Sequence, residues 1–247
     1  MELMRDEVRE RWHRGKYVIP NAVTLGNMFC GFLCIKYAAF GQFEKAAIAI
    51  GIAILLDGLD GRVARGLNAT SKFGLEFDSF SDVISFGVAP AFLMYHWCFR
   101  PLADEFGVIV CFLFCLSAAI RLARFNITDA SIKNFEGLPT PGAAGVVGAL
   151  VNFKPTITPS FPFLGLGTVL TLYLSYLMVS RVEFFSIKRI KITNMNKFVI
   201  LCLGVGIAVV WYDSGKGFLL LAMMYMLSGP LMYLRKKLAK NTWPKAA

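Results

Sequence analysis

Long apolar segments recur along this chain and restrict its fold more than any other feature. Crossing the hydrocarbon core of a bilayer takes about 20 mostly apolar residues in a helix. Such segments lie near residues 21–40, 43–64, 79–99, 104–123, 139–155, 162–182, 197–212 and 217–234. Because backbone polar groups cannot stay unpaired in lipid, helices are the expected structure. The sequence therefore predicts an all-α polytopic membrane bundle of about eight transmembrane helices.

The composition agrees with this prediction, because 56% of the 247 residues are hydrophobic and only 17% are charged, unlike an average soluble domain. The fifth segment is short and rich in Gly and Ala between residues 141 and 150. Small residues of this kind predict close packing between helices. A buried half-span is the alternative for this segment, and it would change the pairing of the others.

Basic residues predict which side of the membrane the loops face, because Lys and Arg accumulate on the cytoplasmic side. With eight spans threaded from a cytoplasmic N-terminus, most of the 26 basic residues lie on the inner side. The exceptions are Lys36, Lys45, Arg100, Lys154 and Lys216. Both termini are therefore expected in the cytoplasm. Anionic lipid headgroups explain the net charge of +10, and nucleic acid is not an expected partner.

Residues 1–17 combine alternating charges with an apolar stripe at helical spacing. This pattern is typical of a helix that lies in the membrane interface. We therefore expect an N-terminal cytoplasmic, interfacial helix, with a solvated leader as the alternative.

Four aspartates interrupt the apolar pattern at one end of the second and third segments. A carboxylate within a span is costly and by default indicates a functional site. Asp57 and Asp60 are three residues apart, and Asp78 and Asp82 are four apart, so each pair shares one helix face. A turn through residues 68–71 would make the two helices antiparallel. The four carboxylates would then converge just inside the cytoplasmic interface.

Converging carboxylates repel one another in a low-dielectric site unless they take up protons or bind cations. Oxygen ligands suit Mg²⁺ or Mn²⁺, and the lack of nearby His or Cys argues against zinc. Four carboxylates exceed what one Mg²⁺ usually recruits, so two ions are expected. A solvated hairpin, in which the acids pair with Arg62, Arg65 and Lys72, is the structural alternative.

Small and basic residues around the acids predict room for a substrate. Gly61, Ala64 and Gly74 remove side chains where a substrate or a second backbone must come close. Arg65 is placed to pair with phosphate oxygens, although positive-inside topology explains this arginine equally well.

The aspartate region resembles the signature of the CDP-alcohol phosphotransferases, which reads DxxDGxxAR, eight residues, then GxxxDxxxD. The matching residues are Asp57, Asp60, Gly61, Ala64, Arg65, Gly74, Asp78 and Asp82. The resemblance implies a lipid-linked CDP donor, a divalent metal, an acceptor alcohol, CMP as leaving group and a homodimer. It also implies that the first three aspartates chiefly hold metal, while Asp82 is both a ligand and the general base. Residues 18–185 would then be the catalytic membrane domain, and residues 186–247 a C-terminal pair of transmembrane helices with a basic tail.

Further stretches resemble the bacterial and archaeal phosphatidylserine synthases of this family, which implies CDP-diacylglycerol as donor and L-serine as acceptor. These stretches are residues 19–24, 30–31, 85–91, 121–126 and 137–141. Asn21 and Thr24 share a helix face and are candidates for binding the cytidine or the diphosphate. Helix capping and hydroxyl back-bonding are their alternative roles.

The candidates for binding the acceptor are Arg121, Arg124 and Asn126, at the inner end of the fourth segment, where the two arginines lie three residues apart. A guanidinium there would bind the serine carboxylate through two hydrogen bonds, while snorkelling to the interface is the alternative for both arginines. Glycerol 3-phosphate, an inositol derivative and choline stay open as acceptors. A divalent-cation channel or transporter is the rival from another class, and it is disfavoured because the acids gather at one end of otherwise apolar spans.

Overall fold

The computed structural model of this protein is a bundle of helices. It describes residues 2–67, 69, 71–101, 104–127, 137–158, 160–182, 184 and 213–241, with the backbone alone for residues 2–17, 104, 214 and 236–241. All regular secondary structure in these residues is helical. The predicted all-α class is therefore confirmed.

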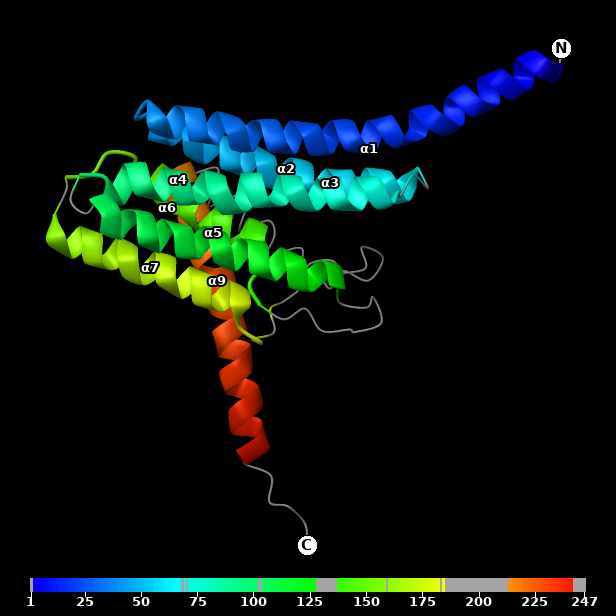
Figure 1. Ribbon diagram of the computed structural model, residues 1–247. Coiled ribbons are helices and arrows are strands. Elements are labelled where there is room, and N and C mark those ends of the chain that lie inside the picture. Colours follow the sequence, from blue (N-terminus) through cyan, green and yellow to red (C-terminus); the bar gives the residue numbers. More distant parts are fainter. Residues whose placement is uncertain are drawn as a thin grey trace, which may run out of the picture.

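The elements follow one another as shown in Figure 1. They are α1 (Glu2–Ala39), α2 (Phe43–Gly66), α3 (Lys72–Asp82), η1 (Val83–Val88), α4 (Ala89–Met94), η2 (Tyr95–Phe99), α5 (Asp104–Ile127), α6 (Thr140–Phe153), α7 (Phe161–Val179) and α9 (Ser214–Asn241). The elements from α3 to η2 form one uninterrupted helical run, in which η1 and η2 are π-helical. Short π-helical stretches inside helices often occur at functional sites, and η1 begins directly after Asp82.

Among the described residues, five helical stretches are long and apolar enough to cross a membrane. They are Val18–Ala39, Lys72–Phe99, Glu105–Ile127, Phe161–Val179 and Gly215–Arg235. Helix α2 is not among them, because two acids and two arginines lie near its C-terminal end, and α6 has only 14 residues. The expected segment at 197–212 lies outside the described residues. The predicted count of eight spans is therefore not confirmed.

The N-terminal region differs from the expectation in one respect. Residues 2–17 continue without a break into the first span, so both belong to the single helix α1. The interfacial position of residues 1–17 stays a prediction.

Helix α1 packs along α2 and α3 and is fastened to the helical run of α3 by two serine hydroxyls. Ser81 donates to the carbonyl oxygen of Thr24 at 3.2 Å, and Ser85 donates to that of Asn27 at 3.0 Å. Gly31 permits this close approach, because a Cβ at that position would lie 2.8 Å from the Cα of Ser85. The contacts fix α1 beside Asp82.

The connection between α2 and α3 lies where the sequence predicts it. Helix α2 ends at Gly66 and α3 begins at Lys72. Ser71 is the N-cap of α3, and its Oγ accepts a hydrogen bond from the backbone N–H of Gly74 at 3.0 Å. A capped start stabilises the first turn of a helix, so the cap fixes the direction in which α3 presents Asp78.

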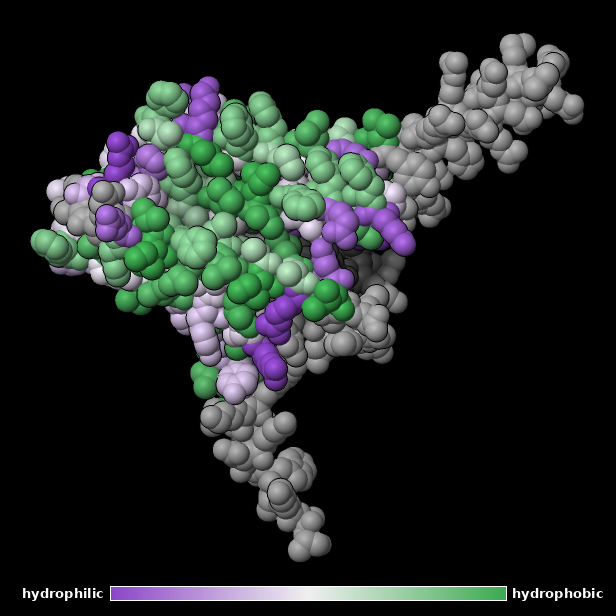
Figure 2. Space-filling view, in the orientation of Figure 1, coloured by the Kyte–Doolittle hydropathy of each residue, from purple (hydrophilic) through white to green (hydrophobic). Residues whose placement is uncertain are grey.

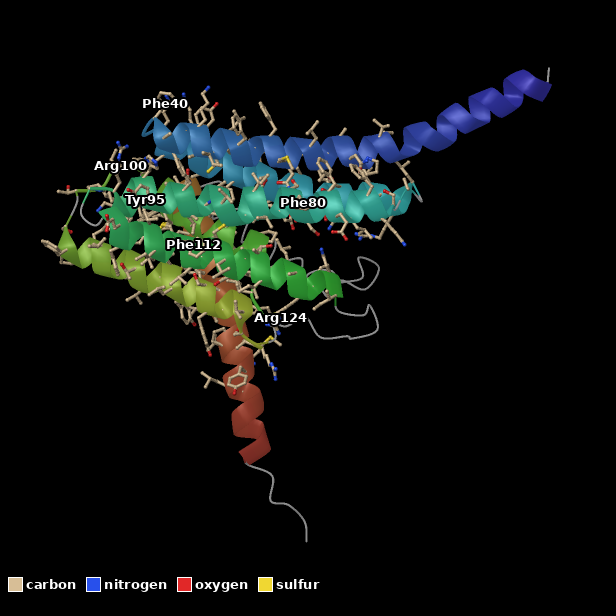
Figure 3. All side chains as sticks on the ribbon, in the orientation of Figure 1. Phe40, Phe80, Tyr95, Arg100, Phe112 and Arg124 are labelled. Atoms are coloured by element: carbon tan, nitrogen blue, oxygen red, sulfur yellow. The ribbon has the colours of Figure 1, made fainter. Side chains whose placement is uncertain are left out.

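The surface carries a broad apolar band with polar side chains toward the two ends of the bundle (Figure 2). Large apolar side chains on α5 and α7 contribute to it, including Phe112 at 61% exposure and Val169 at 67%. Phe112 is labelled on α5 in Figure 3. An apolar belt of this kind suits lipid rather than water, which agrees with an integral membrane protein.

Candidate active site

Three of the four aspartates meet where the C-terminal end of α2 lies beside α3. Asp57 and Asp60 come from one face of α2, and Asp78 comes from α3. Each offers one carboxylate oxygen, and these three oxygens all lie within 4.8 Å of one another. We call these residues the three-aspartate cluster. The predicted convergence of the two helix faces is confirmed for these three carboxylates.

The donor chemistry of the three-aspartate cluster fits a hard divalent cation. Its ligand atoms are all carboxylate oxygens, which Mg²⁺ and Mn²⁺ prefer. Asp60 is buried and the other two are half-buried. Three negative charges held this close in a partly dehydrated site favour cation binding. The residues present therefore fit the metal that the sequence predicts.

Asp82 lies one turn beyond Asp78 and is not part of the three-aspartate cluster. Its side chain is only 9% exposed. The amide nitrogen of Asn27, on α1, donates to Asp82 Oδ1 at a long 3.5 Å. Asp82 is also within electrostatic range of all three cluster carboxylates and of Arg121. The fourth carboxylate is thus close to the other three but occupies a separate place.

Thr24 and Asn21 of α1 lie beside the aspartate region. The Thr24 hydroxyl is 3.1 Å from Asp60 Oδ2 and 3.2 Å from the Pro20 carbonyl oxygen. The contact with the Pro20 carbonyl oxygen is the back-bonding that the sequence left open as an alternative. The contact with Asp60 places the hydroxyl beside a proposed metal ligand, where a diphosphate would bind. A Cβ on Gly74 would lie 3.3 Å from Asn21 Oδ1, so this glycine allows α3 to start against α1.

Gly61, Ala64 and Arg65 form the last turns of α2. The guanidinium of Arg65 covers Gly61, since a Cβ on that glycine would lie 3.6 Å from Arg65 Nη1. Arg65 is exposed and is therefore accessible to a phosphate. The carbonyl oxygen of Ala64 accepts from the backbone N–H of Ala69 at 2.9 Å, which closes the end of the helix.

Of the three predicted acceptor-binding residues, Arg121 is the one brought to the carboxylates. It lies within electrostatic range of Asp82 and Asp57. Its Nε is buried and has no hydrogen-bond partner within the described part of the chain. Buried polar atoms are usually paired, so this nitrogen is available to a ligand.

Arg124 and Asn126 have partners in neighbouring helices. Arg124 Nη1 donates to the Val179 carbonyl oxygen at the end of α7, at 2.8 Å, and Figure 3 shows this arginine where α5 and α7 lie side by side. Asn126 is exposed, and its amide donates to the hydroxyl oxygen of Ser79 at 3.0 Å. Both contacts join helices and point to structural roles.

Asn27 was not singled out from the sequence, yet it is fully buried next to Asp82. Its Oδ1 has no hydrogen-bond partner among the described residues. A signal was present, because Asn21, Thr24 and Asn27 recur every three residues along one side of an apolar helix. A buried amide within a span is rare enough to indicate function.

Comparison with known proteins agrees with this site. Residues 17–234 match the family model described as CDP-alcohol phosphatidyltransferase. A CDP-diacylglycerol–serine O-phosphatidyltransferase of Helicobacter pylori is 40% identical over 192 residues, which cover 74% of this chain and 78% of the relative. The enzyme of that name from Methanocaldococcus jannaschii is 34% identical over 217 residues, covering 88% and 94%. An archaetidylserine synthase of Methanothermobacter thermautotrophicus is 36% identical over 173 residues, covering 67% and 69%. The family signature stands on the residues that build this site, and the chain belongs to the CDP-alcohol phosphatidyltransferase family.

Proposed function

We propose that this protein is an integral membrane enzyme that transfers the phosphatidyl group of CDP-diacylglycerol to L-serine, giving phosphatidylserine and CMP. The relatives from bacteria and archaea carry names of serine-dependent transferases. The observation that supports serine as the acceptor is Arg121, a half-buried arginine within electrostatic range of Asp82. Its buried Nε has no hydrogen-bond partner among the residues that the structure describes. Such a group suits the carboxylate that distinguishes serine from simpler alcohols.

Asp57, Asp60 and Asp78 would hold the divalent metal, Mg²⁺ or Mn²⁺, and Asp82 is proposed as a further ligand in a site for two ions. When bound, the metal neutralises the negative charge that develops on the diphosphate. The asymmetry supports a division of labour. Three carboxylates are gathered into one cluster, while Asp82 lies apart from them and would both bind metal and act as the base toward the acceptor.

The proposed reaction is a transfer of the phosphatidyl group from CMP to the serine hydroxyl. Asp82 accepts the hydroxyl proton of serine, and the serine oxygen forms a bond to the β-phosphorus of CDP-diacylglycerol. The bond from that phosphorus to the oxygen bridging the two phosphates breaks, and CMP leaves with this oxygen. Asn27 holds the Asp82 carboxylate in place through its amide, and Arg121 holds the serine carboxylate.

The donor is proposed to lie along α1 and the end of α2. Asn21 and Thr24 would bind the cytidine or the diphosphate, and Arg65 would pair with phosphate oxygens. Gly61, Ala64 and Gly74 would leave room for them. Since the acyl chains must stay in lipid, the site is expected to open toward the inner leaflet. Both termini are proposed to lie in the cytoplasm, and the protein is proposed to form a homodimer.

A direct assay tests the acceptor. Purified protein is given CDP-diacylglycerol, Mn²⁺ and labelled serine, glycerol 3-phosphate, inositol or choline, and CMP release is measured for each. We expect CMP release with serine. If CMP release depends on another alcohol, serine is not the acceptor, but the proposed transfer chemistry stands. Cation flux without CMP release would favour a transporter.

Variants of the arginines test the position of the acceptor. Arg121→Gln is expected to raise KM for serine by at least about tenfold, because it removes a charged hydrogen bond, while KM for the lipid donor stays unchanged. Arg100→Gln is the matched control, since Arg100 is exposed near the opposite end of the bundle (Figure 3). An unchanged serine KM in the Arg121 variant would remove this residue from the acceptor site.

A further inference from the structure

Helix α9 brings one side chain into electrostatic range of Arg121, although the sequence offers no role for this helix. It packs antiparallel along α6. Near the start of α9, a Cβ on Gly215 would lie 3.5 Å from the Cα of Phe153, the last residue of α6. Ten residues later, Tyr225 lies against Gly142, in the first turn of α6. Figure 1 shows the last turns of α9 extending away from the bundle.

Tyr225 lies on the side of α9 that packs against the first turn of α6. Its phenol lies within electrostatic range of the Arg121 guanidinium, and Arg121 is within the same kind of range of Asp82. The ring is held on two sides. Phe184 packs against it with the ring centroids 6.2 Å apart, and a Cβ on Gly142 would lie 2.8 Å from Tyr225 Cε1. No larger residue fits at position 142 without moving this ring.

A second polar group without a partner lies in the same region. Thr140, the first residue of α6, is fully buried, and its Oγ1 has no hydrogen-bond partner in the part of the chain that the structure describes. Its level along α2 follows from the packing of the two helices. Gly148 lies against Ile50 and Gly145 against Ile54, so Thr140 comes level with the end of α2 that carries Asp57.

The region between α5, α6 and α9 therefore holds two buried polar atoms, Arg121 Nε and Thr140 Oγ1, that have no hydrogen-bond partner among the described residues. Native proteins leave few such atoms unpaired. A polar ligand in this region would supply the missing partners of both atoms. A small, water-soluble acceptor fits, because Asp82 lies within electrostatic range of the same guanidinium.

We propose that Tyr225 is a specificity-determining residue of the acceptor pocket, where its phenol donates a hydrogen bond to the serine carboxylate that Arg121 binds. This inference rests on the proposed function. A guanidinium alone accepts any compact anion, including phosphate. A phenol fixed between Phe184 and Gly142 adds a donor at one defined point, which favours a small planar carboxylate over a larger tetrahedral group.

The test compares Tyr225→Phe with the wild type on two acceptors, L-serine and L-serine methyl ester, in purified full-length protein. The ester keeps the hydroxyl and the ammonium group but lacks the carboxylate charge. We expect kcat/KM for serine to fall about 10- to 100-fold, the usual effect of losing a hydrogen bond to a charged group. The value for the ester and the KM for CDP-diacylglycerol should stay the same. Tyr233→Phe is the matched control, because Tyr233 is exposed on the same helix.

The outcomes separate the two proposals. Wild-type protein that does not use serine would overturn the proposed function. Wild-type protein that uses serine, with Tyr225→Phe unchanged, would overturn only the role of Tyr225. Equal losses on serine and on the ester would show a structural role and would also overturn it. Gly142→Ala, which displaces the Tyr225 ring, is a second variant and should reproduce the serine-selective loss.

Discussion

Replacing Asp82 by asparagine separates chemistry from binding in this site. The change keeps the shape of the side chain but removes its ability to accept a proton. Asp82 lies outside the three-aspartate cluster, so the three carboxylates proposed as the chief metal ligands keep their places. The hydrogen bond from the Asn27 amide to Oδ1 can still form, since an asparagine carbonyl oxygen is also an acceptor.

The expected size of the effect follows from these contacts. A general base contributes about 10²- to 10⁴-fold to a rate, which corresponds to about 3 to 5 kcal/mol in the activation free energy. We therefore expect kcat for serine-dependent CMP release to fall by this factor. The fold should not suffer, because the substitution removes one of four mutually repelling charges. The melting temperature of the metal-free variant should be equal to or above that of the wild type.

Two measurements check the result, and Asp78→Asn is the matched control. Serine-dependent CMP release reports the chemical step, and calorimetric titration with CDP in the presence of Mn²⁺ reports nucleotide binding. Asp82→Asn should lose CMP release while binding CDP nearly as well as the wild type. Asp78→Asn, within the cluster, should weaken CDP binding. If Asp82→Asn keeps more than a tenth of the rate, or loses CDP binding as Asp78→Asn does, the assignment of Asp82 as base is wrong.

Three other perturbations follow from the packing and the charges. Gly31→Ala should lower the melting temperature, at a cost of about 1–3 kcal/mol for overpacking, because the new Cβ would lie 2.8 Å from the Cα of Ser85; Gly51→Ala, with open space around it, should not. Thr24→Val should raise KM for CDP-diacylglycerol by removing the hydroxyl beside Asp60, and an unchanged KM would exclude Thr24 from the donor site. Adding Mn²⁺ at 100 times its Kd should stabilise the wild type by about 2.7 kcal/mol in a thermal melt, and replacing the three-aspartate cluster by asparagines should abolish the shift.

Much of the catalytic site could be predicted because its residues are close in sequence. Asp57 and Asp60 share a helix face by spacing alone, and a short connection after Gly66 leaves α3 beside α2. The convergence of Asp78 with them therefore required only local geometry. The position of these carboxylates beside α1 could not be predicted in this way, because it depends on the tertiary contacts of Gly31 and Ser85.

The acceptor side could not be resolved in the same way. Arg121 and Arg124 have the same side chain and similar spacing from the membrane edge, and only packing distinguishes them. Arg124 reaches a carbonyl oxygen of α7, whereas Arg121 faces the carboxylates. The part that Tyr225 plays depends on a helix about 100 residues further along the chain, a long-range contact that hydrophobic periodicity does not encode.

The span count is not confirmed, for a related reason. A long apolar segment predicts a helix that crosses the membrane. The last turns of α2, however, contain charged residues, and α6 is short. Both pack within the bundle, where α6 lies between α2 and α9. Most side chains of α6 are buried among these helices, whereas α2 also has exposed apolar side chains such as Leu55.

The two serine hydroxyls that fasten α3 and η1 to α1 bond to backbone carbonyl oxygens, those of Thr24 and Asn27. The attachment is therefore indifferent to which side chains stand at these two positions. Residue 24 can be exchanged to suit a different nucleotide or lipid donor while the joint between the helices persists, whereas Asn27 also donates to Asp82. Near the catalytic acid, the backbone of α1 thus joins the helices, while the side chain at position 24 remains free to vary with the donor. This face of α1 is therefore a suitable place to redesign donor selectivity.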